Sequence, residues 1–247
     1  MNFMERYNNF LAKHDIKVWD EDLQRYVKCI TVYKRVFYGD LKGAGRFYSL
    51  GKFQTLKSHL RKTFLLDNEV STEMDYSCLQ PRFLYTMNGI RLVEGWDAYD
   101  IPDLRHLCTS TDQEFRSFMK EVYLCILFST DKKLAIKGIQ SKANKRKDIN
   151  VPNNKVCDMI VETVLVHNEE VRHEFFKDCL WAKLQNMDSR LTEYIIKRFT
   201  DLGKVCLGWH DSYVVCKSDR ELLKSTMEDS WRSLFGLDMN CKIKLEF

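Results

Sequence analysis

Proline and glycine are scarce in this sequence, which contains 3 and 10 of them respectively. So few chain-breaking residues leave little material for long flexible linkers. Apolar residues make up 45% of the chain and charged residues 30%, a balance that is ordinary for a globular protein and argues against disorder. We therefore expect a folded chain with one large domain or two small subdomains.

Long apolar runs are missing as well. No stretch approaches the roughly 18 uncharged residues that a membrane-spanning helix requires, and no apolar segment follows the first residues as in a secretory signal. The nine cysteines are scattered singly and form no C-x₂-C pair, so the sequence predicts neither a zinc ribbon nor a disulfide framework. Together these absences favour a cytoplasmic, reducing location without a membrane partner.

The net charge of +4 is too small to establish a nucleic-acid partner by itself. Its distribution is more informative, because lysine and arginine dominate residues 132–147. This segment is either a solvated basic loop or a contact for a phosphate backbone, whose affinity depends on salt. The second interpretation assigns nucleic-acid binding to Lys142, Lys145 and Arg146.

Hydrophobic periodicity predicts alternating strands and helices. The predicted strands are 33–38, 70–77, 204–209, 213–217 and 241–247, and the predicted helices are 79–89, 112–130, 155–166, 188–202 and 219–235. Glycine-rich residues 41–51 predict a loop or tight turn, and Ser218 and Asp219 are expected to cap the last helix. This order is typical of an α+β fold in which an antiparallel sheet is backed by helices, as in a polymerase palm.

Two aspartates are placed where strands end. Asp75 lies at the end of one predicted strand, and Asp211 lies in the turn between two apolar strands, where Asn-Gly or Asp-Gly is usual. Aspartate is also simply a good turn residue. Carboxylates on neighbouring strand ends can, however, hold two Mg²⁺ ions about 4 Å apart and align a triphosphate with a 3′-hydroxyl. Asp75 and Asp211 are therefore the predicted catalytic residues and metal ligands, with Mn²⁺ expected to substitute.

A basic stripe lies between the two aspartates in the sequence. Arg116, Lys120, Leu124 and Phe128 recur every fourth residue and so share one face of a helix. The two cations can neutralise a triphosphate, and the two apolar residues can press against a base or sugar. The same spacing also suits a surface helix with incidental cations.

Four segments resemble motifs of family A nucleic-acid polymerases. D-Y-S-C-L-Q-P-R (75–82) resembles motif A, and R-x₃-K-x₃-L-x₃-F (116–128) resembles the O-helix of the fingers. H-D-S (210–212) is similar to motif C of single-subunit phage-type RNA polymerases, and G-A-G-R-F-Y-S (43–49) to the T-G-R-L-S-S segment before motif A. Their order and spacing agree, and the whole looks like the compact family A-like polymerases of phages and mobile elements.

The resemblance implies roles for further residues. Asp75 and Asp211 would be the metal ligands, and Arg116, Lys120 and Phe128 would bind the incoming nucleotide. The implied nucleic-acid contacts are Arg46 on the duplex backbone, His210 at the primer terminus and Gln185 in the minor groove. Gln80 replaces a glutamate that excludes the ribose 2′-hydroxyl, and together with Phe128 it leans towards deoxynucleotides.

The resemblance also implies a division of the chain and an activity. It implies a reduced thumb-like region at 1–65, a palm at 66–108 and 161–247, and small helical fingers at 109–160. The expected function is a template-directed nucleotidyltransferase, in the first place a minimal DNA polymerase that extends a primer–template duplex with nucleoside triphosphates. So few residues precede Asp75 that weak processivity, or an accessory protein that clamps the duplex, is expected.

Other functions remain open at this point. An RNA polymerase, a primase-like enzyme or a tailing enzyme of the same fold uses the same residues. A metal-dependent nuclease needs the carboxylates without the Arg116–Lys120 stripe. A non-catalytic nucleic-acid-binding protein could keep a degenerate palm.

Overall fold

The computed structural model describes residues 2–39, 43–51 and 53–247, and the chain divides into two units. Unit 1 combines Met1–Leu79 with Ala182–Phe247, and unit 2 is the continuous segment Gln80–Trp181. Unit 1 holds the antiparallel sheets, whereas unit 2 is built from helices. The mixture of helices and antiparallel strands confirms the predicted α+β class.

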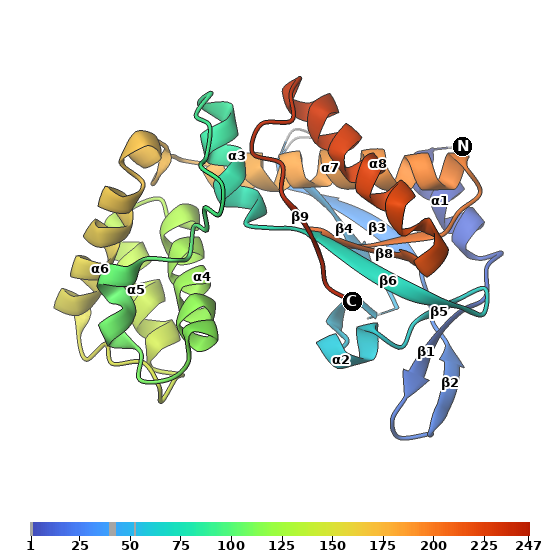
Figure 1. Ribbon diagram of the computed structural model, residues 1–247, viewed down its shortest axis with the longest axis horizontal. Helices are drawn as coiled ribbons and strands as arrows, with labels where there is room; N and C mark the ends of the chain where they lie inside the picture. Colours follow the sequence, from blue (N-terminus) through green and yellow to red (C-terminus); the bar gives the residue numbers. More distant parts are fainter. Residues whose placement is uncertain (1, 40–42, 52) are drawn as a thin grey trace. The chain divides into compact units, whose positions relative to one another are not determined.

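Unit 1 contains a main antiparallel sheet, whose strands are labelled in Figure 1. Asp75 lies in one of these strands, and Asp211 lies in the turn between two others. The strand order of this sheet is β2-β1-β5-β6-β8-β7, and β9 also pairs with β6. The strands are β1 (Ile16–Asp20), β2 (Arg25–Lys28), β5 (Leu65–Leu66), β6 (Glu69–Tyr76), β7 (Cys206–Trp209), β8 (Ser212–Cys216) and β9 (Ile243–Leu245). The strands predicted at 70–77, 204–209, 213–217 and 241–247 are thereby confirmed.

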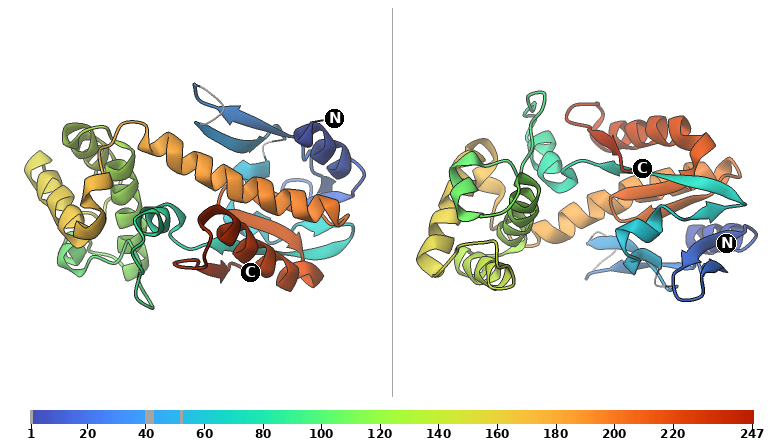
Figure 2. Two further views of the ribbon diagram at one scale, coloured as in Figure 1. Left: turned by 90° about the horizontal axis from the view of Figure 1, so that it is seen from above. Right: turned by 60° about the horizontal axis from the view of Figure 1, so that its bottom comes forward.

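Two helices cover one face of this sheet, as Figure 2 shows: α7 (Leu180–Asp201) and α8 (Arg220–Phe235). The Tyr76 hydroxyl on β6 donates to the Met227 carbonyl of α8 at 2.6 Å. The Tyr213 hydroxyl on β8 shares a hydrogen bond of 2.9 Å with Thr192 of α7. Because successive side chains of a strand alternate between faces, Asp75 projects from the face opposite these helices.

Helix ends differ in detail from the predictions. The helix predicted at 188–202 begins earlier, at Leu180, and Gly203 follows it with a positive φ of 69°. Gly236 ends α8 in the left-handed conformation, as expected. Asp219 is the N-cap residue of α8, as predicted, but its side chain makes no capping hydrogen bond, because its carboxylate accepts from Lys204 at 2.5 Å instead.

The N-terminal part of unit 1 contributes α1 (Phe3–Leu11), η1 (Phe53–Thr55), α2 (Ser58–Arg61) and a separate hairpin of β3 (Tyr33–Phe37) and β4 (Ala44–Ser49). The loop predicted at 41–51 is therefore wrong from Ala44 to Ser49, while 41 and 42 lie outside the described residues. Burial of Phe47 favours the strand. Gly45, with φ of 87°, accommodates an irregular register near Phe37 rather than a turn.

Unit 2 consists of α3 (Leu79–Met87), η2 (Pro102–Leu107), α4 (Asp112–Phe128), α5 (Lys132–Ala143), α6 (Asn154–His167) and η3 (Glu169–Glu174). The interpretation of 132–147 as a loop is wrong over α5. The Asp131 side chain caps this helix by accepting from the Leu134 amide, and Ala135 and Ile139 are buried beneath it. The lysines of the segment therefore occupy defined positions around a helix.

The described residues contain neither a disulfide nor a membrane-spanning helix. All nine cysteines lie within the described residues, and none of them forms a disulfide there. Within residues 2–39, 43–51 and 53–247, no helix combines the length and apolarity needed to cross a bilayer.

Candidate active site

Asp75 and Asp211 meet at the end of two neighbouring strands in unit 1. Asp75 pairs with Ser212 in the β6–β8 register, and the Tyr76 amide donates to the Asp211 carbonyl at 3.1 Å. His210 and Asp211 form the two-residue turn between Trp209 and Ser212, and His210 takes the positive φ of 62° that such tight hairpins need. The turn thus brings the Asp211 backbone beside the end of β6, next to Asp75.

The Asp75 carboxyl group occupies an unusual electrostatic environment. Its side chain is only 17% exposed, and its buried Oδ1 atom has no hydrogen-bond partner among the described residues. Burial, followed by repulsion from Asp211, raises the pKa of Asp75 to about 8, although the nearby Lys244 opposes the shift. Asp75 thus combines a repelling neighbour carboxylate, one buried oxygen without a partner among the described residues and one oxygen next to the Lys244 ammonium.

These residues fit a divalent cation that also binds substrate. The hard carboxylate oxygens of Asp75 and Asp211 are the ligands that Mg²⁺ prefers, and one or two of them suffice when phosphates and water complete the octahedron. No cluster of three or more His, Cys, Asp or Glu side chains suited to a metal occurs in the part of the chain that the structure describes. The donor set therefore suits an ion shared with a phosphate ligand better than a permanently caged metal.

A third carboxylate, Asp188 of α7, lies close to the turn and was missed in the sequence. Its side chain is 1% exposed, and Arg46 of β4 donates to its Oδ2 from Nε at 2.8 Å. Burial raises the pKa of Asp188 to about 6; Arg46 opposes the shift and Asp211 adds to it. Its signal in the sequence is a carboxylate at helical spacing between Leu184 and Leu191, on an otherwise apolar stripe.

Arg46, His210 and Gln185 were predicted to touch nucleic acid, and all three belong to unit 1. Arg46 is held by Asp188 and keeps 21% of its side chain exposed. Burial and the charge of Arg46 lower the pKa of His210, whose ring lies edge-on to Tyr48 with centroids 6.0 Å apart. These effects favour the neutral imidazole of His210. Gln185 is half-buried on α7.

Lys244 of β9 is a further residue that the sequence reasoning missed. Its Nζ lies 3.2 Å from Oδ2 of Asp75, and it also pairs with Glu246. Burial alone would lower the pKa of Lys244, but these two carboxylates raise it, so the ammonium stays charged. The signal in the sequence was the alternation of charged Lys242, Lys244 and Glu246 with apolar neighbours, which gives one face of the strand its charge.

The predicted nucleotide-binding residues Arg116, Lys120, Phe128 and Gln80 belong to unit 2. The first three lie along α4 outside its buried face, and Gln80 of α3 is buried. Arg116 donates from Nε to Asp97 at 2.6 Å and lines a cavity of about 510 Å³ in this unit. Lys120 is exposed, so this stripe presents one cation held by a carboxylate and one open to solvent.

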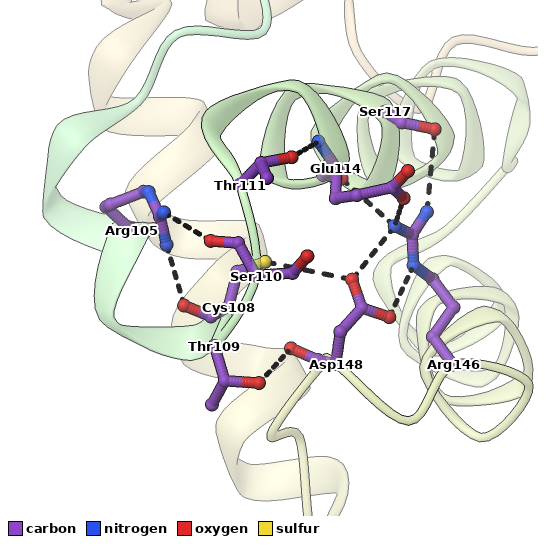
Figure 3. Close-up of polar contacts among 9 residues, drawn as sticks. All are labelled: Arg105, Cys108, Thr109, Ser110, Thr111, Glu114, Ser117, Arg146 and Asp148. Carbon is purple, nitrogen blue, oxygen red and sulfur yellow. Dashed lines mark hydrogen bonds and ion pairs between the residues drawn. The ribbon is translucent and has the colours of Figure 1, made fainter.

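The three basic residues predicted at the end of α5 have different environments. Arg146 is clasped by Glu114 and Asp148, with Nη2 to oxygen distances of 2.5 and 3.1 Å (Figure 3). Lys142 pairs with Glu121 at 3.4 Å. Lys145 is exposed and makes no ion pair with any described residue. The clasp fastens the segment after α5 to the start of α4, which gives Arg146 a structural role.

Lys145 continues a row of exposed residues that begins on α5. Lys133, Lys137 and Ser141 are spaced by four and so share one face of the helix, and Lys145 follows in the turn after it. Lys137, Ser141 and Lys145 line one side of a shallow hollow of about 430 Å³. We call the three lysines of this row the α5 lysine row.

Solved structures similar to this chain include one whose similarity covers nearly all of it. It is the POL domain of Pol1 from M. smegmatis in complex with a DNA primer-template and dNTP, with a TM-score of 0.47 and 13% sequence identity. The similarity covers 96% of this chain and 49% of that one, so this chain spans about half the length of the polymerase domain. No protein-family model and no curated protein matches the sequence.

Proposed function

We propose that this chain is a template-directed nucleotidyltransferase, in the first place a small DNA polymerase of family A type that extends a primer–template duplex with deoxynucleoside triphosphates. The observation that carries the proposal is the pair of Asp75 and Asp211 on adjoining strand ends, with a buried, unpaired oxygen on Asp75. The order of the motifs around them in the sequence adds support.

Asp75 and Asp211 hold the catalytic metal in this proposal. When bound, Mg²⁺ or Mn²⁺ supplies a positive charge that polarises the 3′-hydroxyl and the triphosphate for in-line displacement. Its charge also favours the ionised form of Asp75, whose pKa burial and Asp211 raise to about 8.

The neighbouring side chains orient nucleic acid around this site. Asp188 holds the Arg46 guanidinium, whose remaining donors bind the primer–template backbone in this proposal. The neutral form of His210, which its lowered pKa favours, can accept or donate a hydrogen bond at the primer terminus. Arg116 and Lys120 bind the triphosphate, with Phe128 against the nucleoside and Gln80 selecting the sugar. Duplex clamping by an accessory protein belongs to the same proposal.

Primer extension tests the proposal directly. The wild-type chain, with Mg²⁺ and a labelled primer–template, is offered dNTPs and NTPs separately, beside Asp75→Asn and Asp211→Asn. A matched control is Asp219→Asn, because Asp219 is also a buried carboxylate paired with a lysine and lies outside the site. Template-matched extension by the wild type and the control, lost in both site variants, is the expected result.

The other candidate activities give different results in the same assay. Incorporation of NTPs alone identifies an RNA polymerase or primase, and extension without template identifies a tailing enzyme. Shortening of the labelled strand identifies a nuclease. Binding of the duplex without incorporation of either sugar contradicts the proposal and favours a degenerate palm.

A further inference from the structure

Strand β9 places a cation directly on the candidate metal ligand. Lys244 stands opposite Asp75 in the β6–β9 register, and its ammonium lies 3.2 Å from Asp75 Oδ2. The backbone fixes this position, because the Glu246 amide donates to the Glu73 carbonyl at 2.9 Å. The ammonium therefore occupies a carboxylate oxygen that a divalent ion at Asp75 would need.

Lys244 also has a second carboxylate to hold it. Glu246 follows two positions later, so both side chains lie on the same face of β9, and the structure pairs them. About half of the Lys244 side chain is exposed, which leaves it room to move. Its ammonium can thus leave Asp75 without losing an anionic partner.

We propose that Lys244 is an internal counter-ion that occupies Asp75 in the metal-free protein and yields it when a divalent ion binds, so that it sets the metal affinity of the site. The inference rests on the proposed function, because it requires an ion at Asp75. An ammonium and a divalent cation on one carboxylate repel each other, so metal binding must displace or weaken the lysine contact.

A second lysine–aspartate pair in the same unit provides a comparison. Lys204 pairs with Asp219 at 2.5 Å, and the two pairs have similar exposure, with 42% and 11% here against 46% and 17% for Lys244 and Asp75. Unlike Asp75, Asp219 has no buried oxygen left without a partner among the described residues. Lys204→Gln is therefore a matched control for Lys244→Gln.

The test measures Mn²⁺ binding by electron paramagnetic resonance in the absence of nucleotide and nucleic acid. We expect Lys244→Gln to bind Mn²⁺ roughly threefold to tenfold more tightly than wild type, and Lys204→Gln to bind it equally. Lys244→Gln should also melt at a lower temperature without metal and gain more from Mn²⁺ than wild type does. A merely structural lysine would lower the melting temperature without changing the increment from the metal.

A second variant covers the case in which Lys244→Gln fails to fold. Lys244→Arg keeps the charge and can grip the carboxylate through two donors, so it should bind Mn²⁺ more weakly than wild type. Unchanged or weaker Mn²⁺ binding by Lys244→Gln, or tighter Mn²⁺ binding by Lys244→Arg, overturns the inference. The proposed function still stands in that case, provided that the wild type binds Mn²⁺. If no chain binds Mn²⁺, and Asp75→Asn behaves like wild type, both proposals fail together.

Discussion

The α5 lysine row gives a prediction whose size follows from a count of charges. Lys133, Lys137 and Lys145 are exposed and have no ion pair among the described residues, whereas Lys142 and Arg146 already face carboxylates. If the row binds a nucleic-acid backbone, replacing its three lysines by glutamine removes up to three phosphate contacts. The variant should fold normally, because all three side chains are exposed.

Each phosphate contact releases counterions from the nucleic acid, so the number of contacts sets how steeply the affinity falls with salt. With about 0.7 for each phosphate on a single strand, three contacts change the slope of log K against log salt by roughly 2. Between 50 and 200 mM salt, the wild type should therefore lose roughly 20-fold more affinity than the triple variant. A duplex, with about 0.9 for each phosphate, should give a change nearer 3.

Fluorescence anisotropy with a labelled oligonucleotide over a salt series measures both slopes. The matched control replaces three exposed lysines of unit 1 that have the same charge, namely Lys13, Lys197 and Lys224. We expect the control to keep the wild-type slope. An unchanged slope in the row variant, or an equal change in the control, would refute the reasoning. The lysines of the row would then be solvated side chains that do not bind nucleic acid.

Three further predictions concern buried polar groups. Because folding raises the pKa of Asp75 to about 8, the free energy of unfolding of the metal-free chain should fall as pH rises from 4 to 8. Urea unfolding in EDTA measures this dependence on pH, and Asp75→Asn should reduce it. Arg46→Met leaves Asp188 buried without its partner and should cost about 3 kcal/mol in urea unfolding, most of which a second change, Asp188→Leu, should restore. Asn168→Ala removes the buried acceptor of the Tyr85 hydroxyl and should cost about 2 kcal/mol by the same measurement.

The elements around the candidate site could be predicted because their signals are local. Apolar runs on either side of His210 and Asp211 define a hairpin, and the alternation before Asp75 defines a strand. Glycine at 203 and 236 marked two helix ends correctly. The prediction of a loop in the glycine-rich segment was wrong for a physical reason. Gly45 permits a strand irregularity as readily as a turn, and only the burial of Phe47 decides between them.

The partners of the two aspartates could not be predicted, because they depend on pairing across long stretches of sequence. The pattern of 241–247 predicted a strand, yet nothing in it shows that Lys244 would stand opposite Asp75. Asp188 and Arg46 likewise meet only when α7 packs against β4. The basic segment after residue 131 shows the same limit, since charge alone does not reveal which of its cations already face a carboxylate.

Unit 1 is discontinuous in sequence, and this has a consequence for the growing chain. A ribosome completes all of unit 2 after it has made Asp75 and before it makes Asp211. Until β8 and β9 emerge, β6 lacks both of those neighbours, and Asp75 has neither its fellow carboxylate nor its lysine. A chain that stops before Asp211 therefore lacks half of the proposed metal site, which is complete only when residues 182–247 have paired with residues 1–79.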